Sequence, residues 1–211
     1  MITSIIFSKD RPLQLDLCLK SIKKNFPDST QNIVIQNYSD TFSAANATLT
    51  SEHRDVEWWS QGFSLLRDVY AAIASAKHEY IGLFTDDDIC FSDIPPIPYE
   101  TMFAESYISC ISLRLGLNIC QRFHEGDMFP DKIGEHYVNG NFISWPRTSY
   151  LYGSYWSYSL SVDGHIFRKN DILDMIDELC YLELRYKWDH TPNALEAALQ
   201  RFWTTSPNFM I

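Results

Sequence analysis

The chain reads Tyr80-Ile81-Gly82-Leu83-Phe84-Thr85-Asp86-Asp87-Asp88 at residues 80–88, an apolar run that ends in three consecutive aspartates. A short apolar run is typical of a strand that is covered on both faces of a parallel sheet. In open α/β sheets, ligands bind beyond the carboxyl ends of the strands, where these carboxylates would lie. Carboxylate oxygens are hard ligands that suit Mg²⁺ or Mn²⁺. The stretch therefore predicts an α/β fold with a divalent cation at Asp86–Asp88, against the alternative of a solvated acidic turn.

Strand and helix signals alternate on either side of this stretch. Further strands are expected at 2–8, 32–36, 107–115 and 159–168, and helices from Pro12 to near Pro27 and at 65–76, 170–184 and 193–203. Asn170 and Asn193 are expected to cap the last two helices. The alternation predicts a three-layer α/β sandwich, in which helices flank a central, mostly parallel sheet. At 211 residues the whole chain, 1–211, is expected to form a single domain.

Composition excludes several classes of partner. A net charge of −10 argues against nucleic acid or an anionic membrane. No run approaches the roughly 18 apolar residues of a membrane span, and the N-terminus lacks the pattern of a signal peptide. The five cysteines are far apart and odd in number, which favours a reducing compartment over a zinc site or a disulfide framework. The expected location is the cytoplasm.

Two further segments carry side chains suited to a phosphorylated sugar. Ser8-Lys9-Asp10-Arg11 joins a strand to a helix, where backbone and side chains could contact a base and ribose and Arg11 a phosphate. The alternative is a plain helix start, with Asp10 favoured by the helix dipole. Arg67-Asp68 begins another helix and could bind sugar hydroxyls or phosphate, although a surface pair is the competing interpretation.

The C-terminal part holds candidate catalytic and acceptor-binding residues. On the strand expected at 159–168, period-two geometry would place Asp163 and His165 on one face, where they could bind acceptor, act as a base or ligate a metal. A turn before Gly164 is the alternative for Asp163. Glu196 follows Asn193 at the spacing of a capping box, which we prefer to a catalytic role. Tyr152, Tyr155 and Trp156 lie in an aromatic, hydroxyl-rich segment that could form a sugar platform, or fill the core instead.

In order, these motifs resemble those of glycosyltransferases with the GT-A fold: Ser8-Lys9-Asp10-Arg11-Pro12 after the first strand, Asp40 after the second, Arg67-Asp68, and the aspartates of 86–88. The resemblance covers nearly the whole chain in the order of its elements. The chain looks most similar to the small glycosyltransferase domains encoded by chloroviruses, which are associated with capsid glycan synthesis. This resemblance implies sugar transfer from a UDP-sugar donor to a carbohydrate or glycoprotein acceptor, with Mn²⁺ or Mg²⁺, and favours retention of anomeric configuration.

The resemblance also implies roles for single residues. Segment 8–11 and Asp40 would hold the uridine, Asp86 would contact ribose or metal, and Asp88 would ligate the metal, with Asp87 in the same donor site. GT-A enzymes take a further metal ligand from late in the chain, for which His165 and His190 are both candidates.

Two other function classes stay open. Sugar-1-phosphate nucleotidyltransferases have a similar sheet, but they carry a glycine-rich phosphate loop after the first strand, and Ser8–Gln14 contains no glycine. A non-catalytic carbohydrate-binding module would use the aromatic segment and a bound cation. Such a module would bind free glycan without binding UDP.

Overall fold

The computed structural model describes residues 1–104, 108–118, 121–124, 127–130, 137–139, 142–145, 155–157, 160–183 and 191–205. Helices and strands alternate in the first half of the chain: β1 (Ile2–Lys9), α1 (Pro12–Asn25), β2 (Ser29–Asn37), η1 (Asp40–Phe42), α2 (Ser43–Glu52), β3 (Val56–Ser60), α3 (Leu65–Ser75) and β4 (Tyr80–Thr85). Short strands and two long helices make up the second half: α4 (Tyr99–Met102), β5 (Cys110–Ser112), β6 (Gln121–His124), β7 (Asp127–Pro130), β8 (Tyr137–Asn139), β9 (Phe142–Ser144), η3 (Tyr155–Ser157), β10 (His165–Arg168), α5 (Lys169–Glu183) and α6 (Pro192–Thr205).

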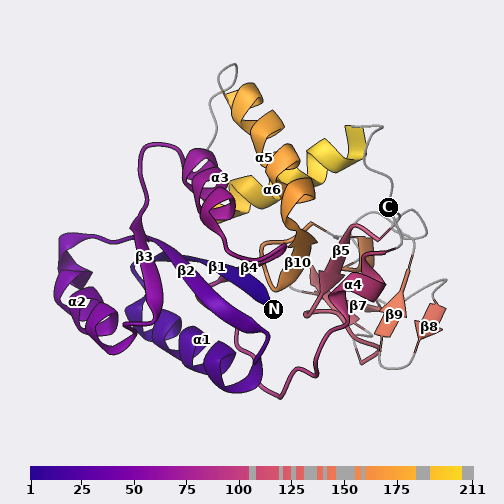
Figure 1. The fold of residues 1–211 in the computed structure, drawn as a ribbon, viewed down its shortest axis with the longest axis horizontal. Helices are drawn as coiled ribbons and strands as arrows, with labels where there is room; N and C mark the ends of the chain where they lie inside the picture. The colour runs from indigo at the N-terminus through magenta and orange to yellow at the C-terminus, as the bar shows by residue number, and fades with distance from the viewer. Residues whose placement is uncertain are drawn as a thin grey trace.

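The central sheet has six strands in the order β3-β2-β1-β4-β10-β5. β3, β2, β1 and β4 are parallel to one another, whereas β10 is antiparallel to both of its neighbours, β4 and β5. The sheet is therefore mixed, and the prediction of a mostly parallel sheet flanked by helices is confirmed. Two small antiparallel sheets, β6-β7 and β8-β9, lie beyond the β5 edge (Figure 1).

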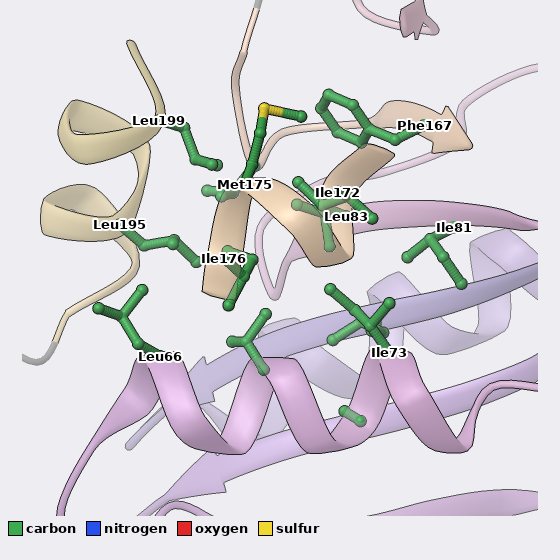
Figure 2. Close-up of a cluster of buried hydrophobic side chains, with 14 of the residues drawn as sticks. Leu66, Ile73, Ile81, Leu83, Phe167, Ile172, Met175, Ile176, Leu195 and Leu199 are labelled. Atoms are coloured by element: carbon green, nitrogen blue, oxygen red, sulfur yellow. The ribbon is translucent and has the colours of Figure 1, made fainter. Parts of the chain in front are cut away.

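Two hydrophobic cores, one on each face of the sheet, hold the three layers together. On one face, α3, α5 and α6 pack against β1, β2, β4 and β10, with Ile73, Leu83, Phe167 and Ile176 among the buried side chains (Figure 2). On the other face, α1 and α2 cover the sheet (Figure 1), and α4 adds Tyr99 to the same cluster. Both faces of β1 are consequently buried, which explains why its sequence is an almost continuous apolar run.

Local signals explain where several helices begin. Pro12 occupies the first turn of α1, where its fixed φ suits the helix and its missing N–H leaves no bond unmade. Ser64 caps α3 by accepting a hydrogen bond from the Arg67 N–H. α5 begins at Lys169, one residue before the predicted cap Asn170. α6 begins at Pro192, and the Thr191 hydroxyl accepts from the Ala194 N–H at 3.2 Å.

Four predictions about elements are corrected by the structure, one of which is the cap at Asn170, since α5 already begins at Lys169. Asn193 lies inside α6, so the predicted capping box with Glu196 is wrong and Thr191 is the cap instead. The strand expected at 107–115 covers only Cys110–Ser112 of the described residues. The strand expected at 159–168 begins only at His165, because Gly164 has φ +69° and interrupts extended structure. Among the described residues, no helix is long and apolar enough to cross a membrane.

Candidate functional site

The strand order reverses between β1 and β4, and this is where the first site residues meet. The chain places β2 and β3 on one side of β1 and then returns to place β4 on the other side. Phe7 of β1 pairs with Thr85 of β4. Ser8, which is still paired with Gln36 of β2, and Asp86, the first residue after β4, therefore lie side by side at the carboxyl edge of the sheet. Ligands of open α/β sheets bind at such a switch point.

β10 and β5 bring two further segments to the same edge. Since β10 is antiparallel to β4, its first residue, His165, pairs with Leu83 near the carboxyl end of β4, and Asp163 precedes it. β5 is antiparallel to β10 and pairs Ser112 with His165, so Arg114 follows at this edge as well. Residues that are distant in the sequence consequently converge at one edge of the mixed sheet.

The first group at this edge, which we call the Arg11 cluster, consists of Ser8, Arg11, Asp86 and Asp87. The Ser8 hydroxyl donates to Asp86 Oδ2 at 2.8 Å, and Arg11 Nη1 donates to Asp86 Oδ1 at 3.2 Å and Asp87 Oδ2 at 3.3 Å. The Asp86 side chain is only 4% exposed, whereas those of Arg11 and Asp87 are 51% and 61% exposed. Burial raises the pKa of Asp86, and the bonds from Ser8 and Arg11 oppose this rise. Arg11 is thus a solvent-accessible cation that forms ion pairs with two carboxylates.

Asp10 joins the ends of the first two strands. Its backbone φ is +55°, and its Oδ1 accepts hydrogen bonds from the Ser39 N–H at 2.7 Å and the Ser39 hydroxyl at 3.1 Å. The Asp10 N–H donates to the Asn37 carbonyl at 3.1 Å. A left-handed backbone in a residue other than glycine is uncommon, although aspartate tolerates it better than most residues do. The carboxylate therefore fixes the loop after β2 against the loop after β1.

The second group, the Arg114 cluster, consists of Thr85, Asp88, Asp163 and Arg114. The Thr85 N–H donates to Asp88 Oδ2 at 2.8 Å, and the Thr85 hydroxyl lies 3.4 Å from that oxygen and 3.3 Å from Asp163 Oδ1. Arg114 Nη1 donates to Asp163 Oδ2 at 3.1 Å. One hydroxyl has one proton, so Thr85 can donate to only one of the two carboxylates at a time.

Asp88 is the carboxyl group whose ionisation this arrangement opposes. Burial raises the pKa of Asp88 to about 7, and the negative charges of Asp163 and Asp87 add to that effect. Among the described residues Asp88 makes no ion pair, in contrast to Asp86, Asp87 and Asp163. A cation bound at this carboxylate would supply the missing positive charge.

The oxygen-rich edge therefore fits a divalent metal ion. Asp86, Asp87, Asp88 and Asp163 supply carboxylate oxygens of the kind that Mg²⁺ and Mn²⁺ prefer. The fold opposes ionisation of Asp88, and a metal ion would reverse that opposition. Asp88 is the carboxylate best placed to ligate such an ion, because both oxygens of Asp86 already accept hydrogen bonds.

Another group of ligand types lies away from these strand ends. Oxygen and nitrogen atoms of Asp16, Glu52 and His53 lie within 4.8 Å of one another. His53 Nε2 is 2.9 Å from Asp16 Oδ1, and the Lys20 ammonium is 2.7 Å from Asp16 Oδ2. The lysine already supplies the positive charge at this group. We interpret it as a polar link between α1 and the end of α2.

His165 was predicted as a metal ligand on the same strand face as Asp163. Its side chain is 0% exposed, and its Nδ1 lies 3.2 Å from the Asp163 carbonyl oxygen, which can only accept, so Nδ1 is the donor. Burial lowers the pKa of His165 to about 3. Nε2 therefore carries a lone pair and has no hydrogen-bond partner among the described residues. Asp163 itself lies before the strand, so the predicted period-two relation is wrong, and His190 is outside the described residues.

The remaining predicted donor residues lie around this edge without contacting the two clusters. Lys9 ends β1 with an exposed side chain, and Asp40 is exposed in η1. Arg67 is exposed in the first turn of α3. Asp68 Oδ2 accepts the Gly62 N–H at 2.7 Å and so closes the loop between β3 and α3. These positions are open to a ligand, except that Asp68 already has a structural bond.

Of the predicted acceptor-binding aromatics, the structure separates Tyr155 from Trp156. Tyr155 is 36% exposed, and the Arg114 guanidinium carbon lies 5.9 Å from the centroid of its ring. Trp156 is 0% exposed and packs edge-on against Trp145, with 5.1 Å between ring centroids. Burial thus gives Trp156 a core-filling place, which corrects the prediction of an exposed platform residue. Tyr152 lies outside the described residues.

Thr85 and Arg114 were missed by the sequence reasoning. The signal for Arg114 was its place as the first charged residue near the end of the strand expected at 107–115, because ligand-binding residues gather at strand ends on the carboxyl edge. The signal could not be used without knowing the direction of β5. Thr85 lies between the apolar residues 80–84, which predict the strand, and the three aspartates, and its residue type gave no signal of its own.

Comparisons with known proteins agree with this geometry at the level of the fold. No protein-family model and no curated protein sequence matches the chain. The crystal structure of S. aureus TarS superposes with a TM-score of 0.51 at 13% identity, covering 82% of this chain and 29% of that chain. S. aureus TarS 1–349 in complex with UDP has a TM-score of 0.50 at 13% identity, covering 95% of this chain and 53% of that chain.

The fold is of the GT-A type. The mixed six-stranded sheet and the superposition on TarS both agree with the predicted fold class. A mannosyltransferase from Pyrobaculum calidifontis, PcManGT in complex with GDP-Man and Mn²⁺, superposes less well, with a TM-score of 0.38 at 14% identity over 53% of this chain and 34% of that chain. The chain spans less than a third of TarS and about half of its 1–349 segment. Structural similarity at 13% identity establishes the fold only, so the activity has to be inferred from the residues of the site.

Proposed function

We propose that the chain is a metal-dependent glycosyltransferase that moves a sugar from a UDP-sugar to a carbohydrate or glycoprotein acceptor. The observation that carries this proposal is the meeting of Asp88 and Asp163 at Thr85, on the ligand-binding edge of a GT-A sheet. It places a carboxylate without an ion pair among the described residues next to a second carboxylate that is held by an arginine. The Asp88 carboxylate is suited to bind a cation, and the Asp163 carboxylate is suited to bind a sugar hydroxyl.

The donor would bind over the Arg11 cluster. Arg11 is half exposed and can turn from Asp86 and Asp87 to a phosphate oxygen, a partner that guanidinium binds well. The uridine would lie along the loops that Asp10 ties together, near Asp40 and Lys9. Arg67 and Asp68 would contact the donor from the start of α3. The UDP bound to the TarS segment supports the choice of uridine.

Asp88 and Asp86 would hold the cation, with His165 as a further candidate ligand. When bound, Mn²⁺ or Mg²⁺ supplies positive charge to the diphosphate as it leaves. The protein by itself is strongly anionic, so this charge has to be provided locally.

Asp163 is the residue that we assign to the chemistry at the acceptor. As the acceptor oxygen bonds to the anomeric carbon and the bond from that carbon to the diphosphate oxygen breaks, Asp163 accepts the hydroxyl proton. Thr85 and Arg114 hold its two oxygens in place. Tyr155 lies next to this group and offers an exposed aromatic ring to a sugar. In-line displacement of this kind would invert the anomeric carbon, whereas the resemblance favours retention, so the anomeric configuration of the product tests the assignment of Asp163 as the base.

The narrower resemblance to chlorovirus enzymes gains no support from the comparisons. Capsid glycans as the product therefore remain a prediction from the sequence alone.

The experiment that tests the proposal is a thermal shift with UDP, GDP and CMP, each with and without Mn²⁺. Free UDP at about 100 times its dissociation constant should stabilise the protein by roughly 2.7 kcal/mol. For a chain of this size, that corresponds to about 5–10 °C in Tm. UDP with Mn²⁺ should exceed the other two nucleotides. Equal shifts for all three would remove the uridine assignment, and the absence of any Mn²⁺-dependent shift would remove the donor site.

A further inference from the structure

The guanidinium of Arg114 lies between Asp163 and the ring of Tyr155. Nη1 donates to Asp163 Oδ2 at 3.1 Å, and the guanidinium carbon is 5.9 Å from the Tyr155 centroid. Both side chains of the ion pair are 31% exposed. The arginine therefore stands at the border between the interior and solvent, on the opposite side of Asp163 from Thr85.

Two backbone segments deliver this pair independently of the aspartate loop. The Ser112 hydroxyl oxygen accepts the N–H groups of Arg114 and Leu115, each at 3.3 Å. The Leu113 N–H donates to the Gly164 carbonyl at 2.9 Å, next to Asp163. The segments that carry Arg114 and Asp163 are thus fastened to each other by main-chain bonds. An ion pair is not needed to hold these segments together.

A contribution to folding stability does not explain why residue 114 is an arginine. Its Nη2 is buried and has no hydrogen-bond partner among the described residues. A buried donor without a partner is destabilising, and ion pairs with partial exposure add little in return. An apolar side chain of similar length would avoid this cost. The position of Arg114 is therefore better explained by what it does to Asp163.

The two oxygens of Asp163 are held from opposite sides. Oδ1 lies 3.3 Å from the Thr85 hydroxyl, and Oδ2 accepts from Arg114. The same hydroxyl lies 3.4 Å from Asp88 Oδ2 and has only one proton to donate. Arg114 is the one cationic partner of Asp163 among the described residues. Without it, a single shared hydroxyl would orient Asp163 close to the like charge of Asp88.

We propose that Arg114 is a positioning residue, which holds the Asp163 carboxylate in the orientation that meets the acceptor hydroxyl. This inference rests on the proposed glycosyltransferase function. Arg114 acts through Asp163 and takes no part in holding UDP, because the donor is proposed to bind over the Arg11 cluster, and the ion pair of Arg114 among the described residues is with Asp163. Its loss should lower kcat and leave donor binding unchanged.

The test compares Arg114→Ala and Arg114→Lys with Arg54→Ala, a control that removes an exposed arginine whose side chain donates to the Ser51 carbonyl. The Mn²⁺-dependent Tm shift with UDP is measured first, and it should be the same in all four proteins. Arg114→Ala should lower kcat about 100-fold, with KM for the donor changed less than about threefold. Arg114→Lys should retain part of the rate, because it keeps the charge without the planar fork.

Two further measurements separate positioning from a structural role. Millimolar guanidinium, far below the molar range that unfolds proteins, should restore rate to Arg114→Ala, with no effect on Arg54→Ala or Asp163→Asn. The double variant Arg114→Ala/Asp163→Asn should be no slower than Asp163→Asn, because the two residues act as one unit. If Arg114→Ala does not fold, the same cycle with Arg114→Lys replaces it.

The outcomes distinguish this inference from the proposed function. A parent protein that shows no Mn²⁺-dependent UDP shift contradicts the proposed function itself. A parent with that shift and an Arg114→Ala variant at parental kcat overturns the positioning role. An Arg114→Ala variant that loses UDP binding in parallel with kcat also overturns the positioning role. A double variant whose loss of kcat equals the sum of the two single losses, expressed as free energies, overturns it as well.

Discussion

Asp88 carries a carboxyl group whose ionisation the surrounding fold opposes, through burial and the charges of Asp163 and Asp87. We expect a metal ion to be the partner that this position lacks. Asp88→Asn keeps size and shape and removes the charge. It should abolish the Mn²⁺ dependence of UDP binding and slow turnover by about three orders of magnitude, the loss of several kcal/mol of charge stabilisation.

The measurement is the transfer or donor hydrolysis rate against Mn²⁺ concentration for the parent, Asp86→Asn and Asp88→Asn. Chelation of the parent by EDTA should stop turnover, and added Mn²⁺ should restore it. An Asp88→Asn protein with the parental rate and the parental Mn²⁺ dependence would mean that residues 86–88 are only an acidic turn.

The same residue should make the metal-free protein sensitive to pH. The folded-state pKa of Asp88, about 7, lies above the unfolded value of 3.8, so the folded state holds more protons between these two values. The free energy of unfolding therefore falls as pH rises through this window, and the penalty is complete above pH 7. Asp88→Asn removes the penalty and should stabilise the metal-free protein at pH 8.

We expect a gain of at least about 1.4 kcal/mol, the equivalent of one pKa unit. Urea unfolding at pH 5 and pH 8 measures it, and the gain should shrink at pH 5. Asp177→Asn, at an exposed position of α5 away from Asp88, is the matched control and should change stability by less than about 0.5 kcal/mol. A destabilised Asp88→Asn protein at pH 8 would show that the carboxylate is favourably paired.

At the scale of elements, the turn before β10 decides where Asp163 lies. Gly164 has φ +69°, its N–H donates to the Leu83 carbonyl, and its carbonyl accepts from Leu113. A Cβ at this position would lie 3.7 Å from Leu113 Cβ, which is ordinary contact, so the cost of Gly164→Ala comes from the backbone. We expect about 1–2 kcal/mol of destabilisation and a lower kcat, because Asp163 moves with the turn.

Denaturant unfolding and transfer kinetics measure the two effects, with Gly116→Ala as the control. A Cβ at Gly116 would meet only Asn118 Oδ1, the end of a flexible side chain, at 2.8 Å. This control should stay within about 0.5 kcal/mol of the parent. Equal behaviour of the two variants would mean that the left-handed turn is not required.

At the scale of the whole molecule, the net charge of −10 opposes every anionic ligand. This repulsion is long-ranged and is screened when the Debye length falls from about 30 Å at 0.01 M salt to about 8 Å at 0.15 M. Binding of UDP without metal should therefore become stronger as salt is raised, by a few-fold. With Mn²⁺ present the dependence should be weaker, because the complex carries less charge.

Isothermal titration calorimetry at the two salt concentrations provides the comparison. Weaker metal-free binding of UDP at high salt would mean that the attraction of Arg11 and Lys9 for the diphosphate outweighs the repulsion from the net charge. That result would shift the proposed anion site from a metal ion to basic side chains.

Much of the fold could be predicted because its signals are local. Strands β1 and β4 are apolar runs bounded by polar turns, and Pro12 marks the start of α1. The predicted bounds of the two strands and the predicted start of the helix therefore agree with the structure to within one or two residues. The failures came where a local signal competed with another. Gly164 delayed the start of a strand that was expected from residue 159, and Thr191 capped α6 in place of Asn193.

The sequence by itself determined the α/β class, the helices that cover β1 and the delivery of three aspartates to a strand end. Burial and periodicity act over a few residues, which is why one chain without relatives suffices for these features. Only the tertiary structure decided the partner of each aspartate. Asp86 bonds to Ser8 because β4 pairs with β1, and Asp163 meets Arg114 because β10 is antiparallel to both β4 and β5. Strand order and direction are set by the packing of the whole chain, so no single segment carries that information.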